Sequence, residues 1–327
     1  MRVSVTGATG FVGRVLVTRL LAGGAAVKAL ARPSPRTDAL EAMGVEVVRG
    51  NLADAEAVAR AVSDAEVVYH TAAKVSGPGP REEFIETNAG GTQRVLEACL
   101  QQGVSRVVYL SSIAVYGLAQ EGRRIDENTP FDEKPETRDS YSHSKILADS
   151  RAMTFARKTG LPVTILREGL VYGPGRPLPV ALLGFRAGKT DFIFGNRSNR
   201  IPLNYVDNLV DAMVLASRFD DRELRQYVVI DDDDLTLEAY HRIRGEIEHA
   251  STLFFSGWPV LASATVADAA RLGLSIGQRE GAAFSTYQVR RALQNRWYDS
   301  RRIREETGWS PNVPLREAIE RIAAHHV

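Results

Sequence analysis

The sequence predicts an α/β fold in which a doubly wound parallel sheet is joined by a smaller, interleaved C-terminal lobe. Over the first two-thirds of the chain, short β-branched runs alternate with segments of helical period, which is the pattern of parallel βαβ units. The runs are almost continuously apolar, as expected of strands that helices cover on both faces. A glycine-rich turn directly after the first run is the third observation, because such turns open the first helix of these sheets.

The expected elements can be placed by residue number. Strands are expected at 3–6, 26–31, 46–49, 67–70, 107–110 and 163–167, with helices at 12–21, 36–43, 55–63, 82–102 and 142–159. After Gly173 the pattern loosens, and we expect a strand at 227–230 and helices at 207–218, 237–249 and 315–324. We expect residues 1–172 to form the first domain and residues 173–327 the second lobe, with elements of about 203–249 returning to the first.

The composition is that of an ordinary soluble globular protein. Of 327 residues, 41 are Lys or Arg and 40 are Asp or Glu, so the net charge of +1 gives no general attraction to nucleic acid or anionic membranes. The single cysteine, Cys99, excludes a disulfide framework and a Cys-rich metal site, and its apolar surroundings favour core packing over a nucleophilic role. The acidic run 231–234 is interpreted as a solvated loop before a helix, and no metal is expected.

The chain shows no targeting segment and no stretch expected to cross a membrane. A glycine follows within the first seven residues, before the apolar region of a signal peptide could form. The longest uncharged stretch, 250–267, contains Ser and Thr residues, Gly257 and Pro259, which disfavour a membrane-spanning helix. It also contains aromatic residues that fit either an apolar substrate wall or packing within the lobe. We therefore expect a cytoplasmic protein.

A glycine motif, TGATGFVG, lies at residues 6–13 between the first expected strand and helix. Glycines there permit a tight turn and the close approach of a pyrophosphate, whose charge the helix N-terminus stabilises. The spacing is GxxGxxG, and the alternative is a purely structural turn. The strand–turn–helix context favours a dinucleotide site, and hence a Rossmann-type sheet.

The end of the second expected strand favours NADP over NAD. In NAD sites an acidic residue at this place takes the ribose hydroxyls. Here the strand ends at Ala31 and is followed by Arg32 and Arg36, with no carboxylate at hand. Guanidinium groups suit a 2′-phosphate, although the arginines could also be solvated loop residues of an enzyme that uses NAD.

Tyr141 and Lys145 stand four residues apart on one face of an expected helix. A tyrosine, with a pKa ordinarily near about 10, is a poor acid–base group at neutral pH, and a neighbouring ammonium lowers that pKa. The preceding strand ends in Ser111-Ser112, and a serine hydroxyl can polarise a substrate oxygen.

Together these motifs resemble the extended branch of the short-chain dehydrogenase/reductase superfamily, over nearly the whole chain. The matching segments are TGATGFVG (6–13), GNLAD (50–54), HTAA (70–73), Asn88 with Gly91-Thr92, LSSIAVYG (110–117), YSHSK (141–145), LREGLVYGPG (166–175), NYVDNLVDA (204–212) and residues 304–311.

The resemblance implies a catalytic Ser112, Tyr141 and Lys145, with Tyr141 as the acid–base and Lys145 holding the nicotinamide ribose. With the arginines above, the implied cofactor contacts are Thr6, Gly7, Thr9, Gly10, Phe11, Val12, Gly13, Arg32, Arg36, Asn51, Leu52, Thr71, Ala72, Ala73, Asn88, Tyr141, Lys145, Gly169 and Val171. The branch often pairs two helices of each subunit, so a homodimer is expected. Glu168 stands where the family usually has proline, and His143 is either a solvated helix residue or a proton relay.

The residues favour one of the family's reactions over the others. Ile113-Ala114 replaces the acidic pair of the dehydratases, and the arginine pattern before the NYVD segment departs from that of the sugar-nucleotide epimerases. The pattern is closer to 3β-hydroxysteroid dehydrogenases and dihydroflavonol reductases. We expect an NADP-dependent oxidoreductase that interconverts a ketone and a secondary alcohol on a fairly apolar small molecule. A sugar or sugar-nucleotide epimerase is the alternative, and a non-catalytic nucleotide-binding protein is a third.

Overall fold

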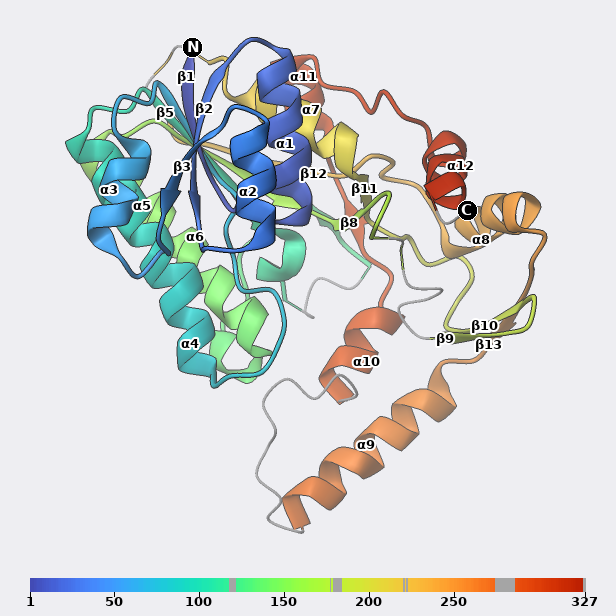
Figure 1. Cartoon of the computed structure of the whole chain (residues 1–327). Helices are drawn as coiled ribbons and strands as arrows, with labels where there is room; N and C mark the ends of the chain where they lie inside the picture. Colours follow the sequence, from blue (N-terminus) through green and yellow to red (C-terminus); the bar gives the residue numbers. More distant parts are fainter. Residues whose placement is uncertain are drawn as a thin grey trace.

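The computed structural model describes residues 1–117, 122–176, 178, 184–219, 221, 223–273 and 286–325 (Figure 1). Its centre is a seven-stranded sheet in the order β12-β7-β5-β4-β1-β2-β3, with every neighbouring pair parallel. The strands are β1 (Arg2–Thr6), β2 (Ala26–Ala31), β3 (Glu46–Arg49), β4 (Val67–His70), β5 (Arg106–Ser112), β7 (Val163–Glu168) and β12 (Arg225–Val229). The predicted α/β class with a doubly wound parallel sheet is confirmed.

Helices cover both faces of this sheet (Figure 1). One face packs on α1 (Phe11–Ala22), α2 (Pro35–Ala42), α7 (Val206–Ala216) and α11 (Arg301–Thr307). The other packs on α3 (Ala55–Val62), α5 (Gly91–Gln101) and α6 (Ser140–Thr159). Each face has its own buried apolar cluster, which explains why the strands are apolar on both sides.

The helix expected at 82–102 is not uniform. It consists of α4 (Arg81–Ile85), a π-helical turn η1 (Glu86–Gly90) and α5. The π turn contains the buried Asn88, whose side-chain amide is fully used in hydrogen bonds to other segments. Periodicity alone could not predict this turn, because a π turn shifts the helical register by one residue without changing composition.

Outside the central sheet and its covering helices, the described chain forms further short strands and helices. β8 (Leu170–Tyr172) pairs with β11 (Leu203–Tyr205), and β10 (Thr190–Phe194) lies between β9 (Gly184–Ala187) and β13 (Ser251–Phe255). β6 (Arg124–Ile125) pairs with β14 (Trp297–Tyr298), and the 3₁₀ turns are η2 (Ile113–Val115) and η4 (Pro135–Thr137). The helices are α8 (Leu237–Glu248), α9 (Trp258–Gly273), α10 (Thr286–Leu293) and α12 (Leu315–His325). The uncharged stretch 250–267 therefore divides between β13 and the first half of α9.

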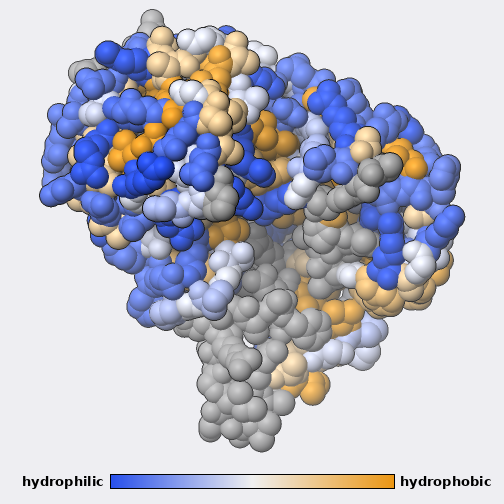
Figure 2. Space-filling model, viewed as in Figure 1, coloured by the Kyte–Doolittle hydropathy of each residue, from blue (hydrophilic) through white to orange (hydrophobic). Residues whose placement is uncertain are grey.

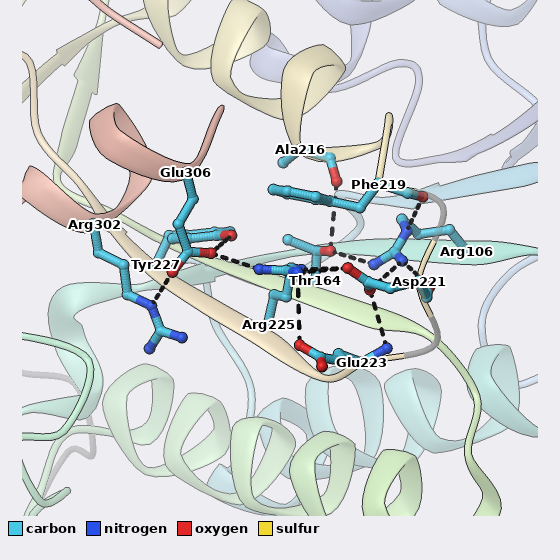
Figure 3. Close-up of polar contacts among 10 residues, drawn as sticks. All are labelled: Arg106, Thr164, Ala216, Phe219, Asp221, Glu223, Arg225, Tyr227, Arg302 and Glu306. Atoms are coloured by element: carbon cyan, nitrogen blue, oxygen red, sulfur yellow. Dashed lines mark hydrogen bonds and ion pairs between the residues drawn. The ribbon is translucent and has the colours of Figure 1, made fainter. Parts of the chain in front are cut away.

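An ion-pair network joins the amino end of β5 to β12 and α11, away from the motifs that end the strands (Figure 3). Asp221 accepts hydrogen bonds from the guanidinium groups of Arg106 and Arg225, and Arg225 also pairs with Glu306 at 2.6 Å. The Tyr227 hydroxyl donates to the same Glu306 carboxylate at 2.6 Å. This network fastens the edge strand β12 and helix α11 to β5.

The surface shown in Figure 2 is mostly hydrophilic over the helical layers. Among the described residues, no helix is long and apolar enough to cross a bilayer. The same residues hold no group of three or more His, Cys, Asp or Glu side chains placed to bind a metal ion. Cys99 is buried in the core, where burial raises the pKa of its thiol.

Candidate functional site

The glycine loop follows β1 and is packed too tightly for a side chain at Gly7 or Gly13. Gly7 has φ +80°, and a Cβ there would lie 2.7 Å from the amide nitrogen of Ala72. A Cβ on Gly13 would collide with the carbonyl oxygen of Gly7, to which Gly10 donates a hydrogen bond of 2.9 Å. Helix α1 begins at Phe11 without a side-chain cap, so its first amides face the loop's open side. This arrangement fits the pyrophosphate of a dinucleotide.

The segment Thr71–Ala73, after β4, lies against this loop. Thr71 donates a hydrogen bond to the carbonyl of Thr6 at 2.8 Å, and Ala72 donates one to the Thr6 hydroxyl at 3.4 Å. His70, the last residue of β4, lies between two hydroxyls, 2.7 Å from that of Thr6 and 2.9 Å from that of Thr92. Burial, and secondly the charge of Lys145, lowers the pKa of His70 to about 3, so its imidazole is neutral at physiological pH.

The two arginines after β2 lie beside the glycine loop and are exposed. The Arg36 guanidinium donates to the carbonyl of Thr9 at 3.4 Å, and the carbonyl of Arg32 accepts from Thr37 at 2.9 Å. The hydrogen bond from Thr37 fixes the Arg32 backbone at the end of β2, and the Arg32 side chain is exposed to solvent there. Beyond β3, Asn51 is exposed, while Leu52 is buried in the core.

Helix α6 carries Tyr141 and Lys145. It begins after Asp139, whose carboxylate caps the helix by accepting from the amide of Ser142 at 2.9 Å. Tyr141, in the first turn, is half-buried, and Lys145, one turn later, is 3% exposed. The helix thus holds a phenol at the edge of the site above a buried ammonium group.

Lys145 is fixed by β5, the strand that ends in Ser112. Its ammonium donates to the carbonyl of Leu110 at 2.8 Å and to the hydroxyl of Tyr109 at 3.3 Å. An ammonium has three N–H donors, so one remains for another acceptor. Burial lowers the pKa of Lys145, and the charges of Asp149 and Glu168 act in the opposite direction. The Tyr109 ring stacks on His70 with centroids 5.4 Å apart, which connects Lys145 to the edge of the glycine loop.

Behind Lys145, Asp149 continues the same helix face. Its carboxylate pairs with Arg167 of β7 at 2.9 Å, and both side chains are completely buried. Ser111 donates a hydrogen bond to the same carboxylate. The neighbouring Ser112 is 7% exposed, and its hydroxyl accepts from the amide of Ala114 at 3.2 Å. Ser111 is therefore committed to the core, whereas Ser112 lies at the strand end.

Asn88 holds the site together from the π turn. Its side-chain oxygen accepts from the amide of Lys74 at 2.7 Å, and its nitrogen donates to the Lys74 carbonyl and to the Ser144 hydroxyl. Both polar atoms of the side chain, Oδ1 and Nδ2, are thus used within the protein, and both N–H groups are donated. The structure gives Asn88 a positioning role between the segment after β4 and helix α6.

The segment after β7 closes the other side. The amide of Gly169 donates to Asn204 at 2.7 Å, and Val171 pairs with Asn204 in the β8–β11 ladder. Further on, the Arg176 guanidinium lies 5.7 Å from the centroid of the Phe11 ring. The end of LREGLVYGPG thereby meets the start of α1.

The carboxyl edge of the sheet therefore brings the glycine loop, Ser112 and Lys145 to one region, and Arg36 contacts the glycine loop at the carbonyl of Thr9. His70, Tyr109 and Thr92 were not among the expected cofactor or catalytic residues, although His70 and Thr92 stand in segments that carry the family resemblance. His70 stands inside the HTAA motif and was detectable there, whereas Tyr109 in an apolar strand is indistinguishable from a core residue. No spacing rule connects Thr92 to His70, 22 residues earlier.

A sequence model of the NAD dependent epimerase/dehydratase family matches residues 3–229. The chain belongs to this family. The match covers the whole region just described, from the glycine loop through Ser112 and Lys145 to the last strand of the sheet.

Two relatives are reductases or dehydrogenases by name. A 2-alkyl-3-oxoalkanoate reductase of Shewanella oneidensis is 32% identical over 221 residues, which are 65% of this chain and 56% of that protein. A 3beta-hydroxysteroid-dehydrogenase/decarboxylase isoform 1 of Arabidopsis thaliana is 28% identical over 97% of this chain and 77% of its own. The chain thus spans little more than half of the first relative's length.

Two solved structures share the fold across the entire chain. The crystal structure of gox2253 has a TM-score of 0.80 and 23% identity, covering 99% of this chain and 97% of its own. MoeE5 in complex with UDP-glucuronic acid and NAD has a TM-score of 0.72 and 25% identity, covering 100% of this chain and 99% of its own.

Proposed function

We propose that this protein is a nicotinamide-dependent oxidoreductase that interconverts a ketone and a secondary alcohol on a fairly apolar small molecule. The observation that carries the proposal is the placement of the Lys145 ammonium, buried one helical turn from Tyr141 and tied to the strand that ends in Ser112. A buried cation close to a phenol stabilises its anionic form, which is what a tyrosine acid–base group needs near neutral pH.

The cofactor, when bound, supplies or accepts a hydride. In the reductive direction Tyr141 donates its proton to the oxygen of the substrate carbonyl, and Ser112 donates a hydrogen bond to the same oxygen. Lys145 stabilises the resulting phenolate through its charge and keeps an N–H for the cofactor ribose. Ser111 does not take part, because its hydroxyl is used by Asp149.

The relatives support this reaction and this class of substrate. One is named for the reduction of an oxo group on an alkanoate and the other for a steroid alcohol, and both substrates are largely apolar. The alternative, a sugar-nucleotide epimerase, is favoured by the likeness to MoeE5, whose structure contains UDP-glucuronic acid and NAD. Its chemistry would use the same three residues.

For the cofactor we propose NADP in preference to NAD. The end of β2 carries Arg32 where an NAD site has a carboxylate, and the Arg36 guanidinium approaches the glycine loop from the same side. Both guanidinium groups are exposed, as a 2′-phosphate site requires before binding. The 2′-phosphate is a good partner for such groups because it accepts two hydrogen bonds at once.

The experiment is a substrate panel with the full chain, followed through the absorbance of the reduced cofactor. The panel contains medium-chain 3-oxo acids, steroid ketones and UDP-sugars, each with NADPH and NADH. Consumption of NADPH with an oxo compound supports the proposal. Interconversion of UDP-sugars without net change in cofactor absorbance would establish the epimerase instead, and binding of cofactor with no turnover of any compound would leave only a nucleotide-binding protein.

A further inference from the structure

Glu168 occupies a position that the proposed reaction has not used. It is the last residue of β7, and in the parallel ladders it is the register partner of Ser112 in β5 and of Val229 in β12. Register partners on adjacent strands project to the same face of a sheet. The Glu168 and Ser112 side chains therefore lie on the same face of the sheet, at its carboxyl edge, where Lys145 also lies.

The environment of this carboxyl group is unusual. One of its oxygens, Oε2, is shielded from solvent and has no hydrogen-bond partner among the described residues. A buried carboxyl oxygen without a partner is costly, and such atoms are commonly satisfied by a ligand or water. The groups that face Glu168 are the Lys145 ammonium from α6, the Arg176 guanidinium from the segment after β8, and the uncharged Ser112 and Val229.

Burial and charge act on Glu168 in opposite directions. Burial raises the pKa of its carboxyl, the charges of Lys145 and Arg176 lower it, and the balance lies at about 7. The group consequently changes its charge within the pH range in which a cell or an assay operates. His70 adds no competing titration at this pH, because burial keeps its imidazole neutral.

We infer that Glu168 places a negative charge beside the nicotinamide and makes the protein hold the oxidised cofactor more tightly relative to the reduced one. The inference rests on the proposed function, because it assumes that the nicotinamide lies among Ser112, Tyr141 and Lys145. The oxidised ring carries a positive charge and the reduced ring none, while the rest of the cofactor is the same. A carboxylate at this place therefore distinguishes the two forms by ring charge alone.

This charge also assists reduction of the substrate. As hydride leaves, the ring acquires positive charge, and the Glu168 carboxylate stabilises that charge without moving. Glu168 is thus a positioning charge for the cofactor, and the proton remains the task of Tyr141.

The test measures dissociation constants of the oxidised and reduced cofactor by titration calorimetry, between pH 5.5 and 8.5, for the wild type and Glu168→Gln. The quantity to compare is the dissociation constant of the oxidised cofactor divided by that of the reduced cofactor. Because both forms carry the same 2′-phosphate, the effect of its titration cancels in this ratio. We expect this ratio to fall in the wild type as pH rises through about 7. In Glu168→Gln the ratio should vary less with pH than in the wild type, because only ionisation of Tyr141 remains to change the charge beside the ring. At pH 8.5 it should be roughly tenfold higher than in the wild type, the effect of one opposite charge within about 4–6 Å.

Two further variants separate the charge from other effects. Glu168→Asp keeps the charge and should retain the pH dependence, whereas Glu238→Gln removes an exposed carboxylate of α8 and should leave the ratio unchanged. Circular dichroism confirms that each variant is folded. An equal ratio in Glu168→Gln and wild type, or a wild-type ratio that does not change with pH, overturns the inference while leaving the proposed function intact. Failure of the wild type to bind either cofactor form refutes the proposed function, and the inference with it.

Discussion

Asp149 and Arg167 form an ion pair, 2.9 Å long and fully buried, that joins helix α6 to strand β7. Asp149 lies one turn beyond Lys145 on α6, and Arg167 directly precedes Glu168 on β7. The pair therefore sets the helix that carries the acid–base residues against the strand that carries the proposed cofactor charge. Arg167 also donates to Gln226 of β12 at 2.7 Å, so the contact extends to the edge of the sheet.

Breaking this pair should destabilise the fold strongly. Asp149→Ala leaves a guanidinium in the core without its carboxylate, and we expect a loss of about 3–5 kcal/mol in the free energy of unfolding by urea. The double variant Asp149→Leu/Arg167→Met removes both charges and should be less destabilised than the single variant. A single variant within 1 kcal/mol of the wild type, on the scale of an exposed pair, would show that the pair is not buried in solution.

Tyr141→Phe should lower turnover while sparing cofactor affinity. The phenol hydroxyl acts only on the substrate oxygen, so its removal should cost about 10²–10⁴-fold in rate, the range for general acid–base groups. Turnover is measured on the substrate found in the panel, and the dissociation constant of NADPH by fluorescence. Near-normal turnover in this variant would direct attention to His143 and Glu168 as proton donors.

Lys145→Ala and Ser112→Ala provide the comparison for Tyr141. In the proposed mechanism Lys145 serves both the phenol and the cofactor ribose, so its removal should impair both rate and NADPH binding. The proposal gives Ser112 a contact with the substrate oxygen but none with the cofactor, so Ser112→Ala should affect mainly the rate. Leu110 and Tyr109 hold the ammonium in place before the cofactor binds. If the affinity for NADPH is unchanged in Lys145→Ala, the proposed contact between this ammonium and the ribose is wrong.

Arg32→Ala should weaken NADPH selectively. The lost contact is a charge-assisted hydrogen bond to the 2′-phosphate, worth about 1.5–3 kcal/mol, and NADH lacks that phosphate. The measurement is the ratio of the NADH and NADPH dissociation constants in the wild type and in the variant. Arg60→Ala, an exposed arginine of α3 that pairs with Glu56, serves as the control. A wild-type preference for NADH would contradict the assignment of NADP.

The expected homodimer remains a prediction that the structure of one chain does not address. Light scattering at micromolar concentration should give twice the chain mass of 35.8 kDa. Leu100 on α5 is 42% exposed and is a suitable position for a charged substitution. If α5 lies in a dimer interface, Leu100→Glu should produce the monomer mass; a monomeric wild type would end the hypothesis.

The central sheet could be predicted because its signals are local. β2, β3 and β4 begin and end at the residues that the β-branched runs indicated, and each is followed directly by a polar residue or glycine, namely Arg32, Gly50 and Thr71. The Tyr141–Lys145 pair was equally accessible, because its spacing is that of one helical turn.

The short strands of the second lobe depend on contacts between distant segments and were missed, whereas the helices expected at 237–249 and 315–324 are found as α8 and α12. β10 pairs with β13, so that Phe192 lies opposite Leu253, and neither strand has a pattern that names its partner. The interpretation of 231–234 as a solvated loop was wrong for Asp231. Its carboxylate accepts hydrogen bonds from the Tyr205 amide at 2.7 Å and from the Asn208 side chain at 2.9 Å, which holds β11 and α7 in place. Sequence charge alone does not reveal such partners.

The network at the amino end of β5 makes a prediction about acid stability. The hydrogen bond from Arg225, opposed by burial and assisted by Arg106, lowers the pKa of Asp221 to about 2. Because this pKa lies below its ordinary value of 3.8, the carboxylate stabilises the fold fully above pH 3.8 and progressively loses that effect as pH falls through about 2.

Asp221→Asn should therefore reduce the free energy of unfolding at pH 7 by about 1 kcal/mol, allowing for screening at a partly exposed site. The difference from the wild type should narrow between pH 4 and pH 2. Glu223→Gln, which removes the more exposed neighbouring carboxylate, should show a smaller difference at pH 7. Urea unfolding at a series of pH values measures both variants, and a difference for Asp221→Asn that stays constant down to pH 2 would show that Asp221 is not held ionised by these arginines.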